Sequence, residues 1–164
     1  MHATLIVISK WLAATSLSQT IQTTGWIIPT LQTIHILCVA VVFTSAVLVD
    51  FRIWRLFERD VPLPQVARRF LPSIWPVLVI LLLTGGLLII GEPRRSLLNA
   101  TFYIKMSLLL AAILLTAALQ SSIAARPAFW HNRRLTGRAL ATLSILIWCG
   151  ILFAGRWIAY TQVG

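Results

Sequence analysis

The chain has 164 residues, of which 59% are hydrophobic and 11% are charged, and its mean hydropathy is +0.88. A soluble globular domain has about half apolar and about a quarter charged residues, so this composition excludes that class. Fourteen basic and four acidic residues give a net charge of +10, and two cysteines exclude a disulfide-rich scaffold. A soluble nucleic-acid-binding protein can be as basic, but it could not keep four long uncharged apolar segments in water. These properties indicate a small polytopic membrane protein.

The first element in chain order is an amphipathic helix at about residues 3–22. One helical face collects Val7, Trp11, Ala14, Ser18 and Ile21. Lys10 interrupts the apolar run, and no small-residue cleavage site follows, so the segment does not have the pattern of a signal peptide. We expect this helix to lie on the outer surface of the membrane.

Four segments have the roughly 20 apolar residues that a helix needs to cross a membrane, at about residues 29–49, 73–91, 102–125 and 139–160. Pro29 suits the first turn of the first span, Pro72 and Pro76 crowd the start of the second, and Asn99 is placed to cap the third. The sequence therefore predicts an all-α bundle of four transmembrane helices, with residues 1–164 forming one integral membrane domain and the N-terminal helix lying at the interface.

The basic residues are unequally divided between the two sides of the predicted bundle. Nine lie on the side of the loops between spans one and two and between spans three and four: Arg52, Arg55, Arg59, Arg68, Arg69, Arg126, Arg133, Arg134 and Arg138. Five lie on the other side: Lys10, Arg94, Arg95, Lys105 and Arg156. The positive-inside rule then predicts a multi-pass protein of the bacterial inner membrane with both termini in the periplasm.

Small residues in the spans favour close packing, since lipid offers no hydrophobic force between helices. They are the adjacent Gly85 and Gly86, and three pairs at a spacing of four: Ser107 and Ala111, Ala118 and Ser122, and Gly150 and Ala154. We expect these residues to pack inside a compact bundle. The alternative is that one small-residue face docks a helix of a partner protein.

Polar residues from all four spans are predicted to meet in the outer half of the membrane. They are His35, Glu92, Lys105 and Arg156, with Tyr103, Trp157 and Tyr160 in the same layer. Ionisable groups inside a membrane usually serve an ion pair or a function. We therefore predict a cofactor-binding site formed by His35, Arg156, Lys105, Trp157 and Tyr160.

Several interpretations of His35 remain open. It could be a structural histidine that is hydrogen-bonded to a neighbouring helix. It could be an axial ligand of b-type haem, with Arg156 or Lys105 pairing with a propionate. It could donate a hydrogen bond to a quinone head group with Arg156 beside a carbonyl. His131, in an inner loop, and His2, at the N-terminus, do not suit the role of second haem ligand.

A metal site is a further alternative. His35, Cys38 and Cys149 fall at similar depths and could hold a soft metal such as copper, with His35 as the principal ligand. The simpler interpretation is that both cysteines are small apolar packing residues.

Asp50 and Arg52 end the first span on the inner side, and we expect a structural ion pair there. Asp50 would pair with an inner-loop arginine such as Arg138 or Arg69 and fix the end of the helix. The functional alternative is a point of proton uptake, although no further chain of carboxylates continues from it.

Five segments carry a resemblance to a known family: Trp11–Ser18, Ile34–Leu37, Leu48–Arg52, Phe102–Lys105 and Phe153–Tyr160. With them the whole chain resembles an uncharacterised family of small four-helix bacterial inner-membrane proteins. More distantly, the architecture is similar to the copper-resistance protein D family and to membrane b-type cytochromes, whose paired haem histidines have no counterpart here beyond His35. The resemblance implies the fold and the location.

Motifs of soluble enzymes are missing from the sequence, which has no glycine-rich phosphate loop, no GxSxG, no HExxH and no CxxC. We therefore expect no catalysis by the chain alone. The function predicted first is a non-catalytic accessory subunit of a periplasm-facing redox or metal-handling membrane complex. The alternatives are an electron-transfer protein with haem or quinone near His35 and Arg156, and a copper-handling membrane protein. The expected partners are the lipid bilayer and other membrane or periplasmic subunits, without nucleic acid.

Overall fold

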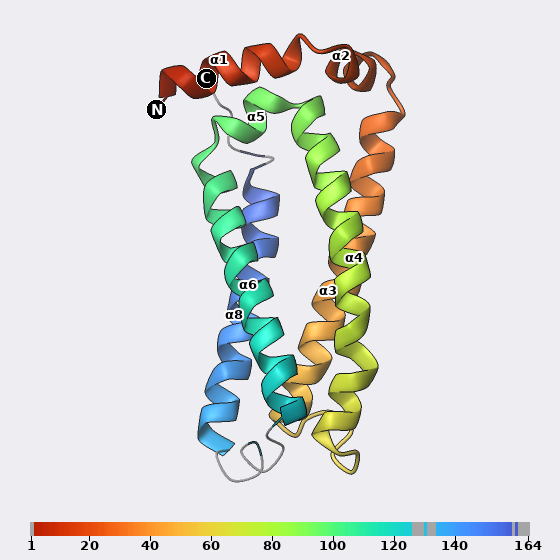
Figure 1. Cartoon of the computed structure of the whole chain (residues 1–164), viewed down its shortest axis with the longest axis vertical. Coiled ribbons are helices and arrows are strands. Elements are labelled where there is room, and N and C mark those ends of the chain that lie inside the picture. Colours follow the sequence, from red (N-terminus) through yellow and green to blue (C-terminus); the bar gives the residue numbers. More distant parts are fainter. Residues whose placement is uncertain (1, 126–129, 131–133, 159, 161–164) are drawn as a thin grey trace.

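A computed structural model describes residues 2–125, 130, 134–158 and 160, and every regular element among them is helical. The four longest helices are α3 (Ile27–Ile53), α4 (Leu63–Gly91), α6 (Ala100–Ala125) and α8 (Arg134–Trp157), and they run side by side along the long axis of the molecule (Figure 1). Each is long and apolar enough to cross a membrane. The predicted all-α four-helix bundle is confirmed, and the chain is a multi-pass membrane protein.

The bundle consists of two helical hairpins, α3 with α4 and α6 with α8, and α8 also packs against α3. The largest buried cluster includes Val42, Val49, Ile74, Ile123 and Trp148. Buried residues begin on α3 only at Val42 and on α6 only at Ala112. The core therefore occupies the middle of the bundle and the end that carries the α3–α4 loop. The opposite ends of α3 and α6 are less tightly packed.

The N-terminal segment forms two helices, α1 (His2–Ala13) and α2 (Ser16–Thr23), instead of the single predicted one. Together with α5 (Pro93–Leu97) they lie across one end of the bundle (Figure 1). The break occurs because the Thr15 hydroxyl caps α2 by accepting a hydrogen bond from the Ser18 backbone N–H, at 3.3 Å. The predicted common face is divided as a result: Trp11 is exposed, whereas Ser18 and Ile21 are buried.

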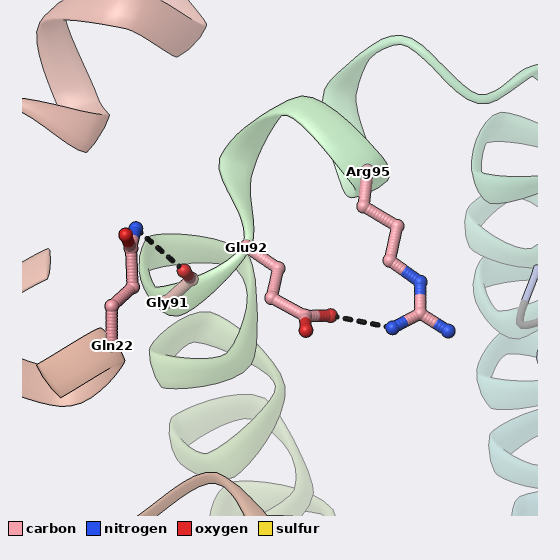
Figure 2. A network of polar contacts seen from close by, with 4 residues as sticks. All are labelled: Gln22, Gly91, Glu92 and Arg95. Atoms are coloured by element: carbon pink, nitrogen blue, oxygen red, sulfur yellow. Dashed lines mark hydrogen bonds and ion pairs between the residues drawn. The ribbon is translucent and has the colours of Figure 1, made fainter. Parts of the chain in front are cut away.

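Helix α2 is anchored to the C-terminal end of α4 by two hydrogen bonds. The Ser18 hydroxyl donates to the Ile90 carbonyl at 2.7 Å. Gln22 Nε2 donates to the Gly91 carbonyl at 2.9 Å, and Figure 2 shows this second bond. The last carbonyls of a helix have no partner within the helix, so these side chains satisfy groups that would otherwise need water. The side chain of Ile21 packs directly on Gly91.

Two helices begin before the membrane spans predicted for them. Helix α4 begins at Leu63, ahead of the span expected from about residue 73, and it contains Pro72 and Pro76 in its interior. A membrane helix tolerates such prolines because neighbouring groups bond the freed carbonyls, and Pro64 occupies the first turn, where the missing N–H has no cost. Helix α8 begins at Arg134 rather than at 139. The predicted cap of α6 is correct, since Asn99 Oδ1 accepts the Thr101 N–H at 2.9 Å.

Helix α6 has two distinct faces. The buried face carries Ala112, Thr116, Leu119 and Ile123. A second row of exposed side chains, here called the α6 seam, consists of Ser107, Ala111, Leu114, Ala118, Ser121 and Ala125. The prediction that Ser107, Ala111 and Ala118 pack inside the bundle is therefore wrong. Gly150 does pack as predicted, against Leu108 of α6.

Candidate functional site

His35 lies on α3 and makes its hydrogen bond with α4. Its Nδ1 is 2.9 Å from the hydroxyl oxygen of Thr84, and that hydroxyl is 2.8 Å from the carbonyl oxygen of Ile80. When the single proton of the Thr84 hydroxyl goes to the Ile80 carbonyl, Thr84 accepts the proton of His35 Nδ1. In that tautomer the lone pair of the ring lies on Nε2, which no described residue bonds. This is the arrangement of a histidine whose second nitrogen is free to accept a hydrogen bond or to bind a metal.

Gly85 provides the space in which the His35 ring lies. A Cβ atom at this position would be 3.3 Å from His35 Cε1. Any larger residue would therefore press against the imidazole. The sequence analysis identified Gly85 only as a packing residue and missed Thr84. The position of Thr84, a polar residue directly before two glycines in an apolar span, could have identified it.

Lys105 supplies the positive charge of this layer. It lies on α6 with a half-buried side chain, and a Cβ atom at Gly155 of α8 would be 3.6 Å from its Nζ. The Lys105 charge is also close enough to His35 for the two groups to interact. Helices α3, α4, α6 and α8 thus all contribute to the surroundings of His35 and Lys105.

The other predicted site residues form a separate group at the end of α8. Arg156 Nη2 donates a hydrogen bond to the Tyr160 hydroxyl at 2.8 Å, and the guanidinium carbon is 5.1 Å from the centre of the Tyr160 ring. Trp157 is exposed at the same end of the bundle. The structure gives no bond between His35 and Arg156. Arg156 instead reaches the residue one helical turn further along, Tyr160.

Glu92, which the sequence assigned to the same layer, is engaged elsewhere. Its carboxylate accepts a hydrogen bond from Arg95 Nη1 on α5 at 2.8 Å, as Figure 2 shows. This ion pair joins residues three apart across the start of a short helix. Glu92 therefore stabilises the α4–α5 connection and does not provide a carboxylate for His35.

The predicted copper ligands do not come together. Cys38 and Cys149 are free and half-buried, and no group of three His, Cys, Asp or Glu residues in the described part of the chain could hold a metal ion. His35 bonds to α4, whereas Cys149 lies on α8. His131 lies outside the described residues.

The ion pair expected at the inner end of α3 is replaced by other contacts. Asp50 is 1% exposed and interacts with the Ser144 hydroxyl of α8, while its Oδ2 has no hydrogen-bond partner. Arg52 Nε donates to the Val61 carbonyl at 2.7 Å. Among the described residues neither side chain forms an ion pair. Residues two apart on a helix point in different directions, so Asp50 faces the bundle and Arg52 faces the loop.

Comparisons with known proteins identify a family but no function. A model described as "Family of unknown function (DUF6644)" matches residues 8–161. No curated protein and no solved structure is significantly similar to the chain. The similarity to the copper-resistance protein D family and to b-type cytochromes therefore stays a prediction. Since the match covers nearly all of the four-helix bundle, the chain belongs to the DUF6644 family of unknown function.

Proposed function

We propose that the chain is a non-catalytic accessory subunit of a redox or metal-handling membrane complex that faces the periplasm. The observation that carries this proposal is the α6 seam. Its six residues follow one another at intervals of four, three, four, three and four positions, which keeps them on one face of the helix. All six are exposed in the isolated chain.

The composition of the seam favours a protein neighbour over lipid. Five of its six residues are Ser or Ala, and only Leu114 is large. Small side chains let the backbone of a second helix approach closely, which is the main source of attraction between helices in a membrane. Lipid tails need no such groove. The seam therefore supports the binding of a partner helix along most of the length of α6.

His35 supports the assignment to redox or metal chemistry. Its Nε2 can act as one ligand or one hydrogen-bond acceptor, and the described residues do not complete a metal-binding set around it. The neighbouring parts of α3 and α6 contain no fully buried side chain. A partner subunit would then supply the remaining ligands, which is consistent with a role as one component of a larger assembly.

Site-specific photo-crosslinking in native membranes tests the proposal. A benzophenone amino acid is placed at Ala111 or Ala118 in the seam, and at Ala40 as the matched control, because Ala40 is an exposed alanine on α3. We expect discrete protein adducts from the two seam positions and none from Ala40. The adducts should contain a protein that carries a redox cofactor or binds a metal.

Blocking the seam provides the second arm of this test. Ala111→Phe should abolish the adduct formed at Ala118, whereas Ala40→Phe should leave it unchanged. Adducts with lipid alone at all three positions would contradict a partner-binding role. Adducts with a partner that carries neither metal nor redox cofactor would contradict the redox or metal assignment while keeping the accessory role.

The second candidate function is electron transfer with a quinone or b-type haem near His35. The free Nε2 favours it, since a quinol hydroxyl could donate to this nitrogen and Lys105 could donate to the second oxygen. This reverses the donor role that the sequence predicted for His35. For haem, Nε2 would be one axial ligand and Lys105 would pair with a propionate. Arg156 is bonded to Tyr160, so it could bind a quinone oxygen or a haem propionate only after that hydrogen bond is broken.

A reduced-minus-oxidised visible spectrum and a quinone extraction of the purified chain test this candidate. Haem would give a Soret band that is lost in His35→Ala and kept in His131→Ala, and quinone would co-purify with the chain and be lost in the same variant. A colourless preparation without extractable quinone would contradict electron transfer by the chain alone.

A further inference from the structure

A cavity of about 250 Å³ lies at the end of the bundle opposite α1 and α2. Four arginines contribute to its lining: Arg52, Arg55, Arg134 and Arg138. A second cavity, of about 450 Å³, shares three of them and adds Arg59. Since the two cavities have these side chains in common, they form one basic region between the α3–α4 loop and the start of α8.

The charge of this region is strongly unbalanced. Two carboxylates, Glu58 and Asp60, are close enough to interact with Arg52, and Glu58 already pairs with Arg69 at 3.5 Å. None of the five lining arginines forms an ion pair within the described residues. Five guanidinium groups thus face two carboxylates, and the region attracts an anion.

Contacts within the chain hold three of the guanidinium groups in place. Arg52 Nε donates to the Val61 carbonyl at 2.7 Å, and Arg59 Nε donates to the Arg55 carbonyl at 2.6 Å. The Arg138 guanidinium stacks over the Trp54 ring at 5.4 Å from its centre. In all three arginines the Nη atoms donate no hydrogen bond to a described residue. Guanidinium groups held in this way can bind the oxygens of a phosphate group bidentately.

The rest of the lining is apolar and indicates what else the ligand contains. Ile53, Leu63, Ile123 and Trp130 share the first cavity with the arginines. The Trp130 indole donates to the Ser122 hydroxyl at 3.2 Å, and its ring packs against Gly137. A free phosphate ion has no apolar part, whereas a phospholipid has a phosphate group for the arginines and acyl chains for the apolar residues. The cavity also lies at the ends of apolar spans, where lipid headgroups are found.

We infer that this cavity binds the phosphate group of an anionic phospholipid. The guanidinium groups bind the headgroup phosphate, and the apolar residues contact the start of the acyl chains. The site lies at the opposite end of the bundle from His35, so it does not depend on the proposed function.

Native mass spectrometry of the full chain in detergent tests this inference, with phosphatidylglycerol, phosphatidylcholine and inorganic phosphate as probes. We expect the chain to bind phosphatidylglycerol at least about tenfold more tightly than phosphatidylcholine. The variant Arg55→Gln/Arg134→Gln removes two exposed guanidinium groups and should weaken phosphatidylglycerol binding about thirtyfold. The single variants should each weaken it about fivefold.

The control is Lys10→Gln/Arg94→Gln, which removes two exposed charges at the other end of the bundle. It should bind phosphatidylglycerol as the unmodified chain does. Equal binding of the two lipids, or equal losses in both double variants, would overturn the inference. Displacement of phosphatidylglycerol by an equal concentration of inorganic phosphate would show a site for the free ion and would overturn the lipid assignment. The single variants keep the test decisive where the double variant unfolds.

Discussion

At the scale of single residues, the hydrogen bond between His35 and Thr84 determines what the imidazole can do. When the Thr84 proton goes to the Ile80 carbonyl, the histidine donates through Nδ1 and keeps Nε2 as an acceptor. One hydroxyl on α4 thereby holds the ring in its orientation and favours this tautomer. Without it, the ring would lose the contact that holds it against α4.

Thr84→Val removes the hydroxyl at nearly constant volume and should lower the free energy of unfolding. The control is Thr142→Val, because the exposed Thr142 hydroxyl makes the same bond to a carbonyl four residues earlier, at 2.9 Å, and no other. We expect Thr84→Val to cost about 1 kcal/mol more than Thr142→Val, since only the former leaves His35 Nδ1 unpaired. Unfolding in mixed dodecyl maltoside and dodecyl sulfate micelles measures both. Equal costs would show that the bond to His35 contributes nothing to stability.

The two adjacent glycines of α4 should respond differently to the same substitution. A Cβ atom at Gly85 would be 3.3 Å from the His35 ring, whereas a Cβ atom at Gly86 would meet nothing within 4 Å. Gly86→Ala should stabilise the helix by about 0.5–1 kcal/mol, because alanine loses less backbone entropy on folding. Gly85→Ala should be at least about 1 kcal/mol less stable than Gly86→Ala.

The same unfolding measurement in mixed micelles compares these variants. If Gly85→Ala proves as stable as Gly86→Ala, His35 can move away from α4 at no cost. The imidazole would then not be held in the position described above.

At the scale of elements, α2 is attached to the bundle through the end of α4. The attachment depends on Ser18, Gln22 and the absence of a side chain at Gly91. A Cβ atom at Gly91 would lie 2.8 Å from Ile21 Cγ2, too close for the present packing, whereas one at Gly25 would meet nothing within 4 Å.

Gly91→Ala should therefore loosen α2 from α4, and Gly25→Ala should not. Hydrogen–deuterium exchange of the amides in residues 16–23 measures the difference, with faster exchange expected in Gly91→Ala alone. Unchanged exchange in Gly91→Ala would show that Ile21 can turn aside and that the contact does not anchor the helix.

At the scale of the whole molecule, the apolar spans could be predicted because length and hydropathy alone decide whether a helix can cross a bilayer. The ends of the spans could not all be predicted. Pro72 and Pro76 are helix breakers in water, yet they lie inside α4 because the membrane environment and neighbouring groups tolerate them. At Thr15 the error has the opposite sign. The apolar pattern predicted one continuous helix, but the Thr15 hydroxyl caps α2 and divides the segment into two helices.

The contacts of the candidate site could not be predicted from the sequence. Sequence positions placed His35, Lys105 and Arg156 in the same layer, but the direction of each side chain depends on the rotation of its helix. Arg156 bonds to Tyr160 just beyond the end of its own helix, and the charge of Lys105 is the one that acts on His35. Likewise, a count of charges suggested an ion pair for Asp50, whereas packing buries it against Ser144.

The two ends of the molecule differ in ways that give the bundle a direction. One end carries α1, α2 and α5, with the His35 layer beneath them, and the other carries the arginine-lined cavities. The proposed accessory role depends on which end lies on which side of the membrane. The accessory role requires the end with α2 to face the periplasm, as the distribution of basic residues predicts.

Cysteine accessibility in spheroplasts tests this orientation most directly. In a Cys38→Ala/Cys149→Ala background, Gln19→Cys reports on α2 and Arg59→Cys reports on the α3–α4 loop, and both side chains are exposed. A membrane-impermeant maleimide should label Gln19→Cys in intact spheroplasts and Arg59→Cys only after lysis. Labelling of Arg59→Cys in intact spheroplasts, with Gln19→Cys protected until lysis, would reverse the bundle and contradict a periplasm-facing role.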